Sequence, residues 1–555
     1  MSANGGAQLF PTIGMKGGVT MEPAVSGVAG GALAAGTGTA AQPRRTVGQM
    51  IAISIFWFAI NFHWAAVQVL IVPAQVYGLL FLAAPAGSLA ERAAWVDAHK
   101  GLTLAVVVAP GLIVALLSNP FFGLLSDRTP GRLGRRRPYI LGGTLVNIVG
   151  LALMALAPLL ATSDGSGNSL APSLLILMGG LMVVQLANNS AAAPFHALLP
   201  DMVSEGQRGA ASGIMGLALF LGQIGGSLAP AFIGFNTKAL ADGTQTQSAF
   251  DTKIALAYGA VAIVIAIMAI LTAFTVHEQP WTPTQTRPQA GQVQTGRALI
   301  LTLLAVVVVV GVPLALTQAR IGGLALDDNT LSVIQLVGVV VAGIGAAWAF
   351  DFRPRRDPDF SWVVLTRMLV MMGVYTVQNF LQYYMADVAH ASDPTTATTE
   401  FLVILTVTAL VSSLFAGAAS DRYGRKRMVY ISGAFMAAVG AVFIFAPYLT
   451  PNNVLPFALG SAAVFGLGYG AYISVDWALV ADVLPNDETF ARDMGVWNIG
   501  LTLPQVLSAI LGGAFLAFGA SIGQKSLGYT LLFVSFVLFC VLGTVTIRFI
   551  KGVKR

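Results

Sequence analysis

Three ionisable side chains lie inside long runs of apolar residues, where charge is otherwise rare. They are Asp476, His196 and His63. Histidine titrates near neutral pH, and an ionisable group at membrane depth is a functional candidate. We therefore expect Asp476 and His196 to be the leading proton-coupling residues, with His63 third. For Asp476 the open alternative is a structural ion pair with Arg367.

Amide and aromatic side chains recur at helical spacing in the same apolar runs. At 100° per residue, Asn61, Trp64, Gln68 and Gln75 fall on one helix face, and a shift of 314 residues finds a matching stripe. Amides beside an aromatic ring suit a polyhydroxyl ligand, whereas a single amide in a membrane helix often only bonds to a neighbouring helix. The expected ligand-binding residues are Asn61, Trp64, Gln68, Gln185, Asn188, Asn189, Gln223, Tyr375, Gln378, Gln382, Trp477, Asn498 and Gln505.

The elements that must position these side chains are transmembrane helices. Of 555 residues, 56% are hydrophobic and 10% are charged, against about 25% charged residues in soluble domains. Runs of about 20 apolar residues match the thickness of a bilayer core. The net charge of +6 comes from residues between these runs, which indicates membrane topology rather than nucleic-acid binding. The single cysteine, Cys540, excludes an intrachain disulfide.

The hydropathy pattern predicts fourteen spans. They lie near 50–78, 102–125, 138–160, 172–197, 209–235, 254–276, 298–318, 331–350, 361–385, 400–419, 428–448, 455–481, 494–518 and 527–549. With the N-terminus inside, 23 of the 30 Lys and Arg residues fall in inside segments and 6 in outside loops, and Arg367 lies within a span. We therefore expect a multi-pass protein of the cell membrane (the inner membrane if the cell is Gram-negative), with both termini in the cytoplasm. No cleaved signal peptide is expected, because no apolar run follows a basic start.

A charged phrase occurs twice. GLLSDRTPGRLGRRRPYI at 123–140 recurs as GAASDRYGRKRMVY at 417–430, each after the second span of a six-helix block. Matched halves are typical of a transporter built from parallel repeats. We expect the phrases to latch the cytoplasmic side in one state, with a topology anchor alone as the alternative. The expected gating residues are Gly123, Asp127, Arg128, Arg135, Gly417, Asp421, Arg422 and Arg425.

These phrases resemble the signature of the major facilitator superfamily, G-x-x-x-D-R-x-G-R-R between helices 2 and 3, and the resemblance covers nearly everything from residue 46 onward. SDRTPGRLGRRRPYI, WAAVQVLIVPAQV and ANNSAAAPFHALLPD are also similar to stretches of sucrose transporters and their animal and bacterial relatives. This resemblance implies proton-coupled uptake of a disaccharide or other glycoside by alternating access. The partners implied are a sugar, a proton and the lipid bilayer, without nucleic acid, for a functional monomer.

The chain departs from the sucrose-transporter pattern at two positions. Gln185 stands where that pattern has an aspartate thought to carry the proton, and His196 stands where it has an arginine. Glutamine cannot titrate, so proton coupling at that position is excluded. We therefore expect Asp476, His196 or His63 to carry the proton instead.

The expected fold is an all-α polytopic membrane protein of the major facilitator type, with two six-helix bundles and two extra helices between them. The expected parts are a disordered tail at 1–45, a bundle at 46–279, linkers with two inserted helices at 280–357, and a bundle at 358–555. No cofactor or metal is expected. The chain has no H-E-x-x-H, G-x-S-x-G or phosphate-binding glycine loop, so an enzyme is not expected. The nearer alternative is proton-driven efflux of a drug or metabolite, which is common among fourteen-helix members; the amide stripes favour sugar uptake.

Overall fold

The computed structural model describes most of the chain outside its N-terminal segment and the stretch between the two blocks of helices. The described residues are 45–127, 129, 133–160, 171–203, 208–276, 278, 337, 354–483 and 490–552. The chain divides into two units, Met1–Gln42 and Pro43–Arg555, and every described residue belongs to the second. The expected tail, apart from Arg45, and the inserted spans near 298–318 and 331–350, apart from Val337, lie outside the described residues.

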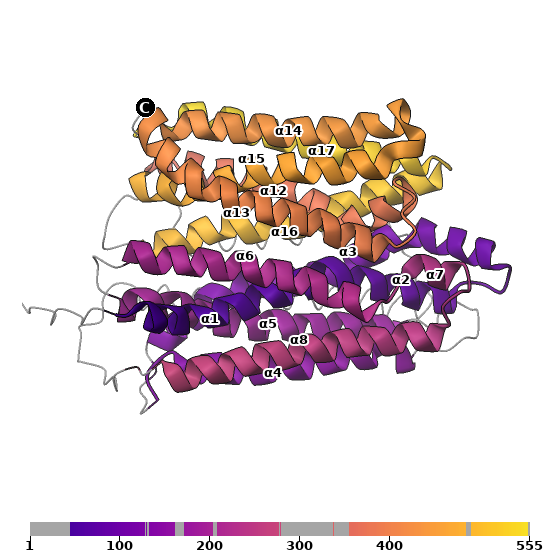
Figure 1. Ribbon diagram of the computed structural model, residues 1–555, viewed down its shortest axis with the longest axis horizontal. Coiled ribbons are helices and arrows are strands. Elements are labelled where there is room, and N and C mark those ends of the chain that lie inside the picture. The colour runs from indigo at the N-terminus through magenta and orange to yellow at the C-terminus, as the bar shows by residue number, and fades with distance from the viewer. Residues whose placement is uncertain are drawn as a thin grey trace, which may run out of the picture. The chain divides into compact units, whose positions relative to one another are not determined.

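Every regular element of the described residues is a helix. In the first block these are α1 (Val47–Trp64), the π-helix η1 (Ala65–Ile71), α2 (Val72–Ala83), α3 (Leu89–Asp127), α4 (Arg137–Leu156), η2 (Ala157–Leu160), α5 (Ala171–Met202), α6 (Arg208–Ile233), α7 (Thr237–Ala241) and α8 (Gln247–Thr275). In the second they are α12 (Pro358–Asp387), α13 (Pro394–Tyr423), α14 (Arg425–Leu449), η6 (Pro451–Asn453), α15 (Val454–Val483), α16 (Phe490–Ser521), α17 (Lys525–Thr546) and η8 (Ile547–Phe549). Figure 1 shows the long helices of each block running alongside one another.

The helices agree with twelve of the fourteen predicted spans. Eleven helical segments of the described part are long and apolar enough to cross a bilayer, and α3, which is not one of the eleven, covers the predicted span near 102–125. Local sequence sets several of the helix starts: Thr46 forms a capping box with Gln49, and the Asp393 side chain accepts hydrogen bonds from the first amides of α13. The chain is therefore a polytopic, all-α membrane protein.

The helices pack as two bundles that meet along two helix pairs. In the N-terminal bundle, α1 packs against α6 and α8, and α5 packs against α3 and α4. In the C-terminal bundle, α12 packs against α16 and α17, and α15 packs against α13 and α14. Between the bundles, α3 contacts α16 and α6 contacts α13. We call the end that holds the start of α1 and the end of α17 the proximal end, and the opposite end the distal end.

A π-helix interrupts the first span. The segment Ala65–Ile71 lies between α1 and α2, directly before Pro73. A π turn holds more residues than an α turn, so it rotates the side chains that follow it. The predicted stripe from Asn61 to Gln75, which assumed 100° per residue throughout, is accordingly divided. Gln75 bonds the Met154 carbonyl and the Tyr258 hydroxyl inside the N-terminal bundle.

Glycines allow the closest helix crossings. A Cβ added at Gly226 of α6 would overlap the carbonyl oxygen of Phe62 in α1, and one at Gly470 of α15 would overlap the carbonyl oxygen of Ala409 in α13. Small residues let membrane helices approach backbone to backbone, where dispersion contacts hold them together. These two crossings are therefore intolerant of any side chain.

Gly226→Ala should destabilise the protein by about 1–3 kcal/mol, because the added methyl group must push α1 and α6 apart. Thermal unfolding in detergent would measure the loss. The matched control is Gly216→Ala on the same helix, where an added Cβ meets nothing within 4 Å. Equal stability of the two variants would contradict the close crossing.

Candidate functional site

A buried ion pair lies inside the C-terminal bundle. The Arg367 guanidinium of α12 donates a hydrogen bond to the Asp476 carboxylate of α15, and the two side chains are 3% and 1% exposed. The Tyr472 hydroxyl donates to the other carboxylate oxygen at 3.3 Å. The alternative left open for Asp476, an ion pair with Arg367, is therefore present.

Aromatic rings surround this pair. The guanidinium of Arg367 stacks on the Trp497 ring of α16, 3.5 Å from its centroid, and Trp497 is fully buried. The phenols of Tyr375 and Tyr469 are close enough to interact with the same charge. Burying a charge is costly unless it is paired, so the carboxylate and the π face together stabilise Arg367. Protonation of Asp476 would remove its ionic attraction for α12.

Two further predicted residues meet next to this pair. The Tyr375 hydroxyl of α12 lies close enough to the side chain of Gln505 in α16 to interact with it. Both residues were predicted to bind ligand from the repeat alignment. The side chains of Trp477 and Asn498 lie outside the described residues, although their backbones belong to α15 and α16.

In the N-terminal bundle, His63 contacts Asn147. His63 Nε2 lies 3.4 Å from the Asn147 side-chain nitrogen, and both residues are fully buried. His63 Nδ1 and the Asn147 amide oxygen have no hydrogen-bond partner among the described residues. Asn147 is a residue that the sequence reasoning missed; a single asparagine in an apolar run gave no repeat signal.

Two buried amides of α5 lack partners. Gln185 is fully buried and Asn188 is 2% exposed, and neither side chain has a hydrogen-bond partner among the described residues. Gln185 packs against Gly111 of α3. The two positions are three residues apart and so lie on one face, near the middle of the helix. Buried amides are normally satisfied, so this face is suited to a ligand that supplies donors and acceptors.

The remaining predicted ligand-binding residues divide into two groups. Asn61 and Asn189 donate to carbonyls one turn back in their own helices, those of Trp57 and Gln185, and Gln382 donates to Thr395. Only the Gln382 bond, from α12 to α13, matches the alternative that a membrane amide bonds to a neighbouring helix; Asn61 and Asn189 bond within their own helices. The half-buried residues are Trp64, Gln68, Gln223 and Gln378.

His196 lies apart from the buried pairs. Its side chain is exposed, and its ring meets the edge of Trp57 at 4.6 Å between centroids. It therefore contacts α1 near the proximal end of the bundle. His63 and His196 both lie in the N-terminal bundle, whereas Asp476 lies in the other bundle.

The repeated phrases form matching contacts in the two bundles. Arg136 donates to the Ser126 hydroxyl at 2.5 Å, and Arg425 donates to the Ser420 hydroxyl at 3.2 Å. Each serine directly precedes the phrase's aspartate, Asp127 or Asp421, whose side chains lie outside the described residues, as does Arg128. Gly123 and Gly417 lie within α3 and α13, and Arg422 is exposed with its guanidinium over Tyr423.

A left-handed glycine precedes the basic cluster in each phrase. Gly134 has φ +85° and Gly424 has φ +95°, a backbone conformation that side chains with a Cβ rarely adopt. In the first phrase this turn presents the amides of Arg135, Arg136 and Arg137 to Glu278, whose carboxylate accepts hydrogen bonds from all three at 2.8–3.3 Å.

Glu278 therefore caps the N-terminus of α4 from beyond the end of α8. A carboxylate at this position meets unpaired amides and the positive end of the helix dipole. The sequence reasoning missed Glu278. No local signal identifies Glu278, because it lies more than a hundred residues away along the chain.

Two family models match the chain. The model described as MFS/sugar transport protein matches residues 49–321, and the one described as Major Facilitator Superfamily matches residues 363–554. Each match covers one of the two bundles. Together they include nearly all of the described helices.

Curated relatives match over short stretches. Sucrose transport protein SUC3 of Arabidopsis thaliana is 28% identical over 22% of this chain and 22% of its own length, and Proton-associated sugar transporter A of Homo sapiens is 28% identical over 31% and 22%. Multidrug efflux pump LfrA of Mycolicibacterium smegmatis is 23% identical over 29% and 31%. The chain thus spans less than a third of the length of each of these relatives.

Solved structures match over most of the chain. A bacterial homologue of the human peptide transporters PepT1 and PepT2 has a TM-score of 0.57 at 13% identity, covering 90% of this chain and 96% of its own. The xylose transporter XylE from E. coli, in a partially occluded inward-open conformation, has a TM-score of 0.55 at 15% identity, covering 90% and 97%. These likenesses concern the fold.

Asp476→Ala should lower the free energy of unfolding by about 3–5 kcal/mol, because it leaves the Arg367 guanidinium buried without its counter-ion. Arg367→Leu combined with Asp476→Leu should recover most of that loss. Tyr472→Phe, which removes one hydrogen bond to the same carboxylate, should cost about 1 kcal/mol. Thermal unfolding in detergent would compare them; a double variant less stable than Asp476→Ala would contradict the pairing.

Proposed function

Because the chain belongs to the major facilitator superfamily, we propose that it is a secondary active transporter, rather than an enzyme, which takes up a sugar together with protons. The observation that carries the proposal is the membrane-buried carboxylate of Asp476, paired with Arg367 of a different helix. Ionised, Asp476 ties α15 to α12. Protonated, it no longer attracts the guanidinium, so proton binding changes the relative stability of bundle conformations that differ at this contact.

The sugar is assigned to polar groups that have unmet hydrogen-bonding capacity. Gln185 and Asn188 offer two amides on one face of α5, and the half-buried Trp64 offers an aromatic face. Sugar hydroxyls both donate and accept, so they satisfy an amide at each of its atoms. Tyr375 and Gln505 supply a corresponding polar pair in the C-terminal bundle. The similarity to two proteins named as sugar transporters, SUC3 and Proton-associated sugar transporter A, supports a sugar as the substrate.

The proposed orientation places the proximal end, with both termini, in the cytoplasm. The basic residues of the two repeated phrases lie at this end, in agreement with the tendency of Lys and Arg to remain inside. The protein would act as a monomer in the cell membrane, each bundle tilting relative to the other along the α3–α16 and α6–α13 contacts. The repeated phrases and the Glu278 cap would hold the proximal loops.

Proton-driven efflux is the second candidate. The match to Multidrug efflux pump LfrA favours it, and the aromatic side chains around Arg367 are compatible with an apolar cargo. The unpaired amides of α5 favour a polar substrate instead. The direction of net transport separates the two functions.

Proteoliposomes containing the protein should accumulate a labelled disaccharide or hexose when the external medium is acidified, and an uncoupler should abolish the accumulation. Asp476→Asn should retain sugar exchange across the membrane and lose uphill accumulation, because the side chain no longer takes up a proton. Glu400→Gln, at an exposed acid of α13, is the matched control and should behave as wild type.

Other outcomes of this assay assign the proton to a different residue or reject the function. Undiminished accumulation by Asp476→Asn would move the proton-coupling role to His196 or His63. Accumulation that ignores the uncoupler would reject proton coupling. Extrusion of a lipophilic cation, with no uptake of any sugar in a screen of disaccharides, hexoses and pentosides, would favour the efflux function.

A further inference from the structure

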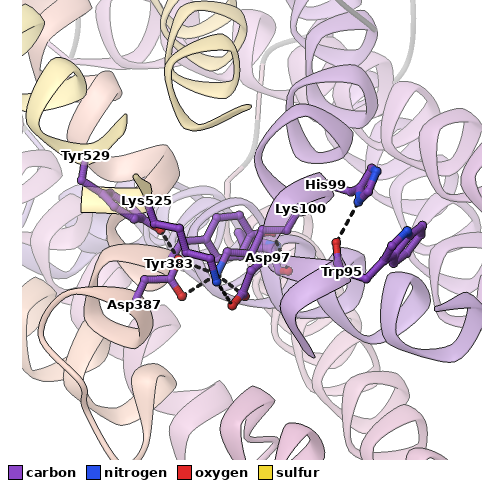
Figure 2. Close-up of polar contacts among 9 residues, drawn as sticks. Trp95, Asp97, His99, Lys100, Tyr383, Asp387, Lys525 and Tyr529 are labelled. Carbon is purple, nitrogen blue, oxygen red and sulfur yellow. Dashed lines mark hydrogen bonds and ion pairs between the residues drawn. The ribbon is translucent and has the colours of Figure 1, made fainter. Parts of the chain in front are cut away.

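A cluster of charges joins the two bundles at the distal end (Figure 2). Lys100 of α3 lies 3.0 Å from Asp97 Oδ1 on its own helix and 2.6 Å from Asp387 Oδ2 of α12. Lys525, the first residue of α17, lies 2.6 Å from the other oxygen of Asp97. The Tyr529 hydroxyl donates to Asp387. We call these five residues the distal lock.

Lys100 is the buried centre of the distal lock. Its side chain is 2% exposed, and its ammonium lies over the rings of Tyr77 and Tyr383, 5.8 and 4.9 Å from their centroids. The Tyr383 hydroxyl in turn donates to the Pro73 carbonyl in the N-terminal bundle at 3.1 Å. A buried ammonium needs counter-charge, and here a carboxylate from each bundle supplies it.

Further hydrogen bonds cross between the bundles nearby. Thr399 of α13 donates to the Ser227 carbonyl of α6 at 3.0 Å, and Asn236 donates to the Ser392 carbonyl at 3.4 Å. Both lie in the distal halves of their helices or in distal loops. The distal ends of the bundles are therefore held together in this conformation, and a solute entering from that end must separate them.

The composition of the distal lock makes this separation feasible. Each bundle contributes one aspartate and one lysine: Asp97 and Lys100 from α3, Asp387 and Lys525 from α12 and α17. When the bundles separate, Lys100 keeps its contact with Asp97, and Asp387 keeps its hydrogen bond from Tyr529. The lock residues of each bundle sum to zero net charge. Separation of the bundles therefore leaves a carboxylate on each side for the lysine of that side.

We propose that the distal lock is the outer gate of the transport cycle: as the gate opens, Lys100 releases Asp387 and keeps Asp97, while Lys525 releases Asp97 and pairs with Asp387 of its own bundle. This inference rests on the proposed function, because a gate is meaningful only in a transporter with alternating access. It adds a second switching contact, separate from the Arg367–Asp476 pair, and it assigns a role to residues that the sequence reasoning left unassigned.

The gate is not a pH switch. Burial alone would raise the pKa of the Asp97 carboxyl, but the ammonium groups of Lys100 and Lys525 outweigh it, so that pKa lies below its ordinary value. Burial would lower the pKa of Lys100, but the carboxylates of Asp387 and Asp97 outweigh it and raise that pKa. Both groups stay charged at neutral pH, and the carboxylate is lost only as the pH falls through its lowered pKa.

No neighbouring group changes this conclusion. The titratable groups that face the lock from outside its five residues are the phenols of Tyr77 and Tyr383 and the carboxyl of Asp242, and neither of these residue types has a reference pKa near 7. His99 turns away, with its Nδ1 2.7 Å from the Trp95 carbonyl and its ring stacked on the Trp95 ring, as Figure 2 shows.

A single cysteine below the lock would report its opening. Ala105 of α3 is 1% exposed and packs against Gly513 of α16, one to two turns inside Lys100. In an Ala105→Cys, Cys540→Ala background, a membrane-impermeant maleimide added to cells should react slowly while the lock is closed. Asp387→Asn should speed the reaction about tenfold, because an open state populated at about a tenth or less then becomes the major one.

The controls distinguish a gate from a purely structural contact. Lys253→Met removes a lysine that donates to the Gly234 carbonyl within the N-terminal bundle at the same end, and it should leave the labelling rate unchanged. Lys100→Glu should speed labelling, and Lys100→Glu combined with Asp387→Lys should return it towards the wild-type rate, because the exchanged charges can pair again. The ratio of the Asp387→Asn labelling rate to the wild-type labelling rate, from which the pH dependence of the thiolate itself cancels, should not change between about pH 6 and 8.

Each outcome bears on the proposal in one direction. The proposal is overturned if a folded Asp387→Asn variant is labelled at the wild-type rate. It is also overturned if Lys253→Met speeds labelling as much as Asp387→Asn does, or if the Lys100→Glu, Asp387→Lys double variant is labelled as fast as Lys100→Glu. Accelerated labelling from the cytoplasmic side alone would refute the proposed orientation while leaving the lock intact. The assay needs no sugar, so failure to find a transported sugar does not affect it.

Discussion

A charge buried among apolar helices must be neutralised by an opposite charge, usually on another helix. Helix α12 contributes to two such ion pairs, one toward each of its ends. Arg367 lies toward its proximal end and pairs with Asp476 of α15, while Asp387 ends the helix distally and pairs with Lys100 of the other bundle. The two positions are twenty residues apart, which is roughly 30 Å along a helix. One rigid element thus connects a proposed proton-binding carboxylate with the contact that holds the distal ends together.

The packing around α12 explains how such a connection can be transmitted. Within the C-terminal bundle the helix packs on α16 and α17, and α16 is the helix that meets α3 of the other bundle. Glycines at the crossings leave no room for the helices to compress, because an added Cβ at Gly226 or Gly470 would meet backbone. A densely packed bundle responds to a changed contact by moving as a body rather than by deforming locally.

The sequence predicted the spans and the repeat because both are written in local composition. Each apolar run of bilayer length can be recognised without reference to the others. The two phrases that contain Asp-Arg can be recognised because charged residues are rare in this chain. Asp476 was found because a carboxylate inside such a run is unusual, and Arg367 was named as its possible partner. The amides gave a weaker signal, because nothing in the sequence distinguishes Gln185 from Asn61. The Gln185 side chain has no hydrogen-bond partner in the described part of the chain, whereas Asn61 bonds its own helix.

What could not be predicted depends on contacts between distant segments or on local helix irregularity. Lys100 looks like an ordinary loop lysine until α12 and α17 are placed beside it, and Glu278 looks like a linker residue until Gly134 turns three amides towards it. The π-helix at Ala65–Ile71 rotated the end of a stripe that had been counted at a constant 100°. The two contacts arise from tertiary packing and the third feature from a change of helix geometry, and residue spacing encodes neither.

The position of Glu278 also bears on the segment that joins the two bundles. Its carboxylate accepts bonds from three consecutive amides at the start of α4, and in the sequence it immediately precedes the stretch that leads to the second bundle. Glu278 is therefore fixed to the end of the same bundle's arginine loop rather than left free beyond α8. A displacement of this carboxylate would reach the start of α4 directly, through the same three amide hydrogen bonds.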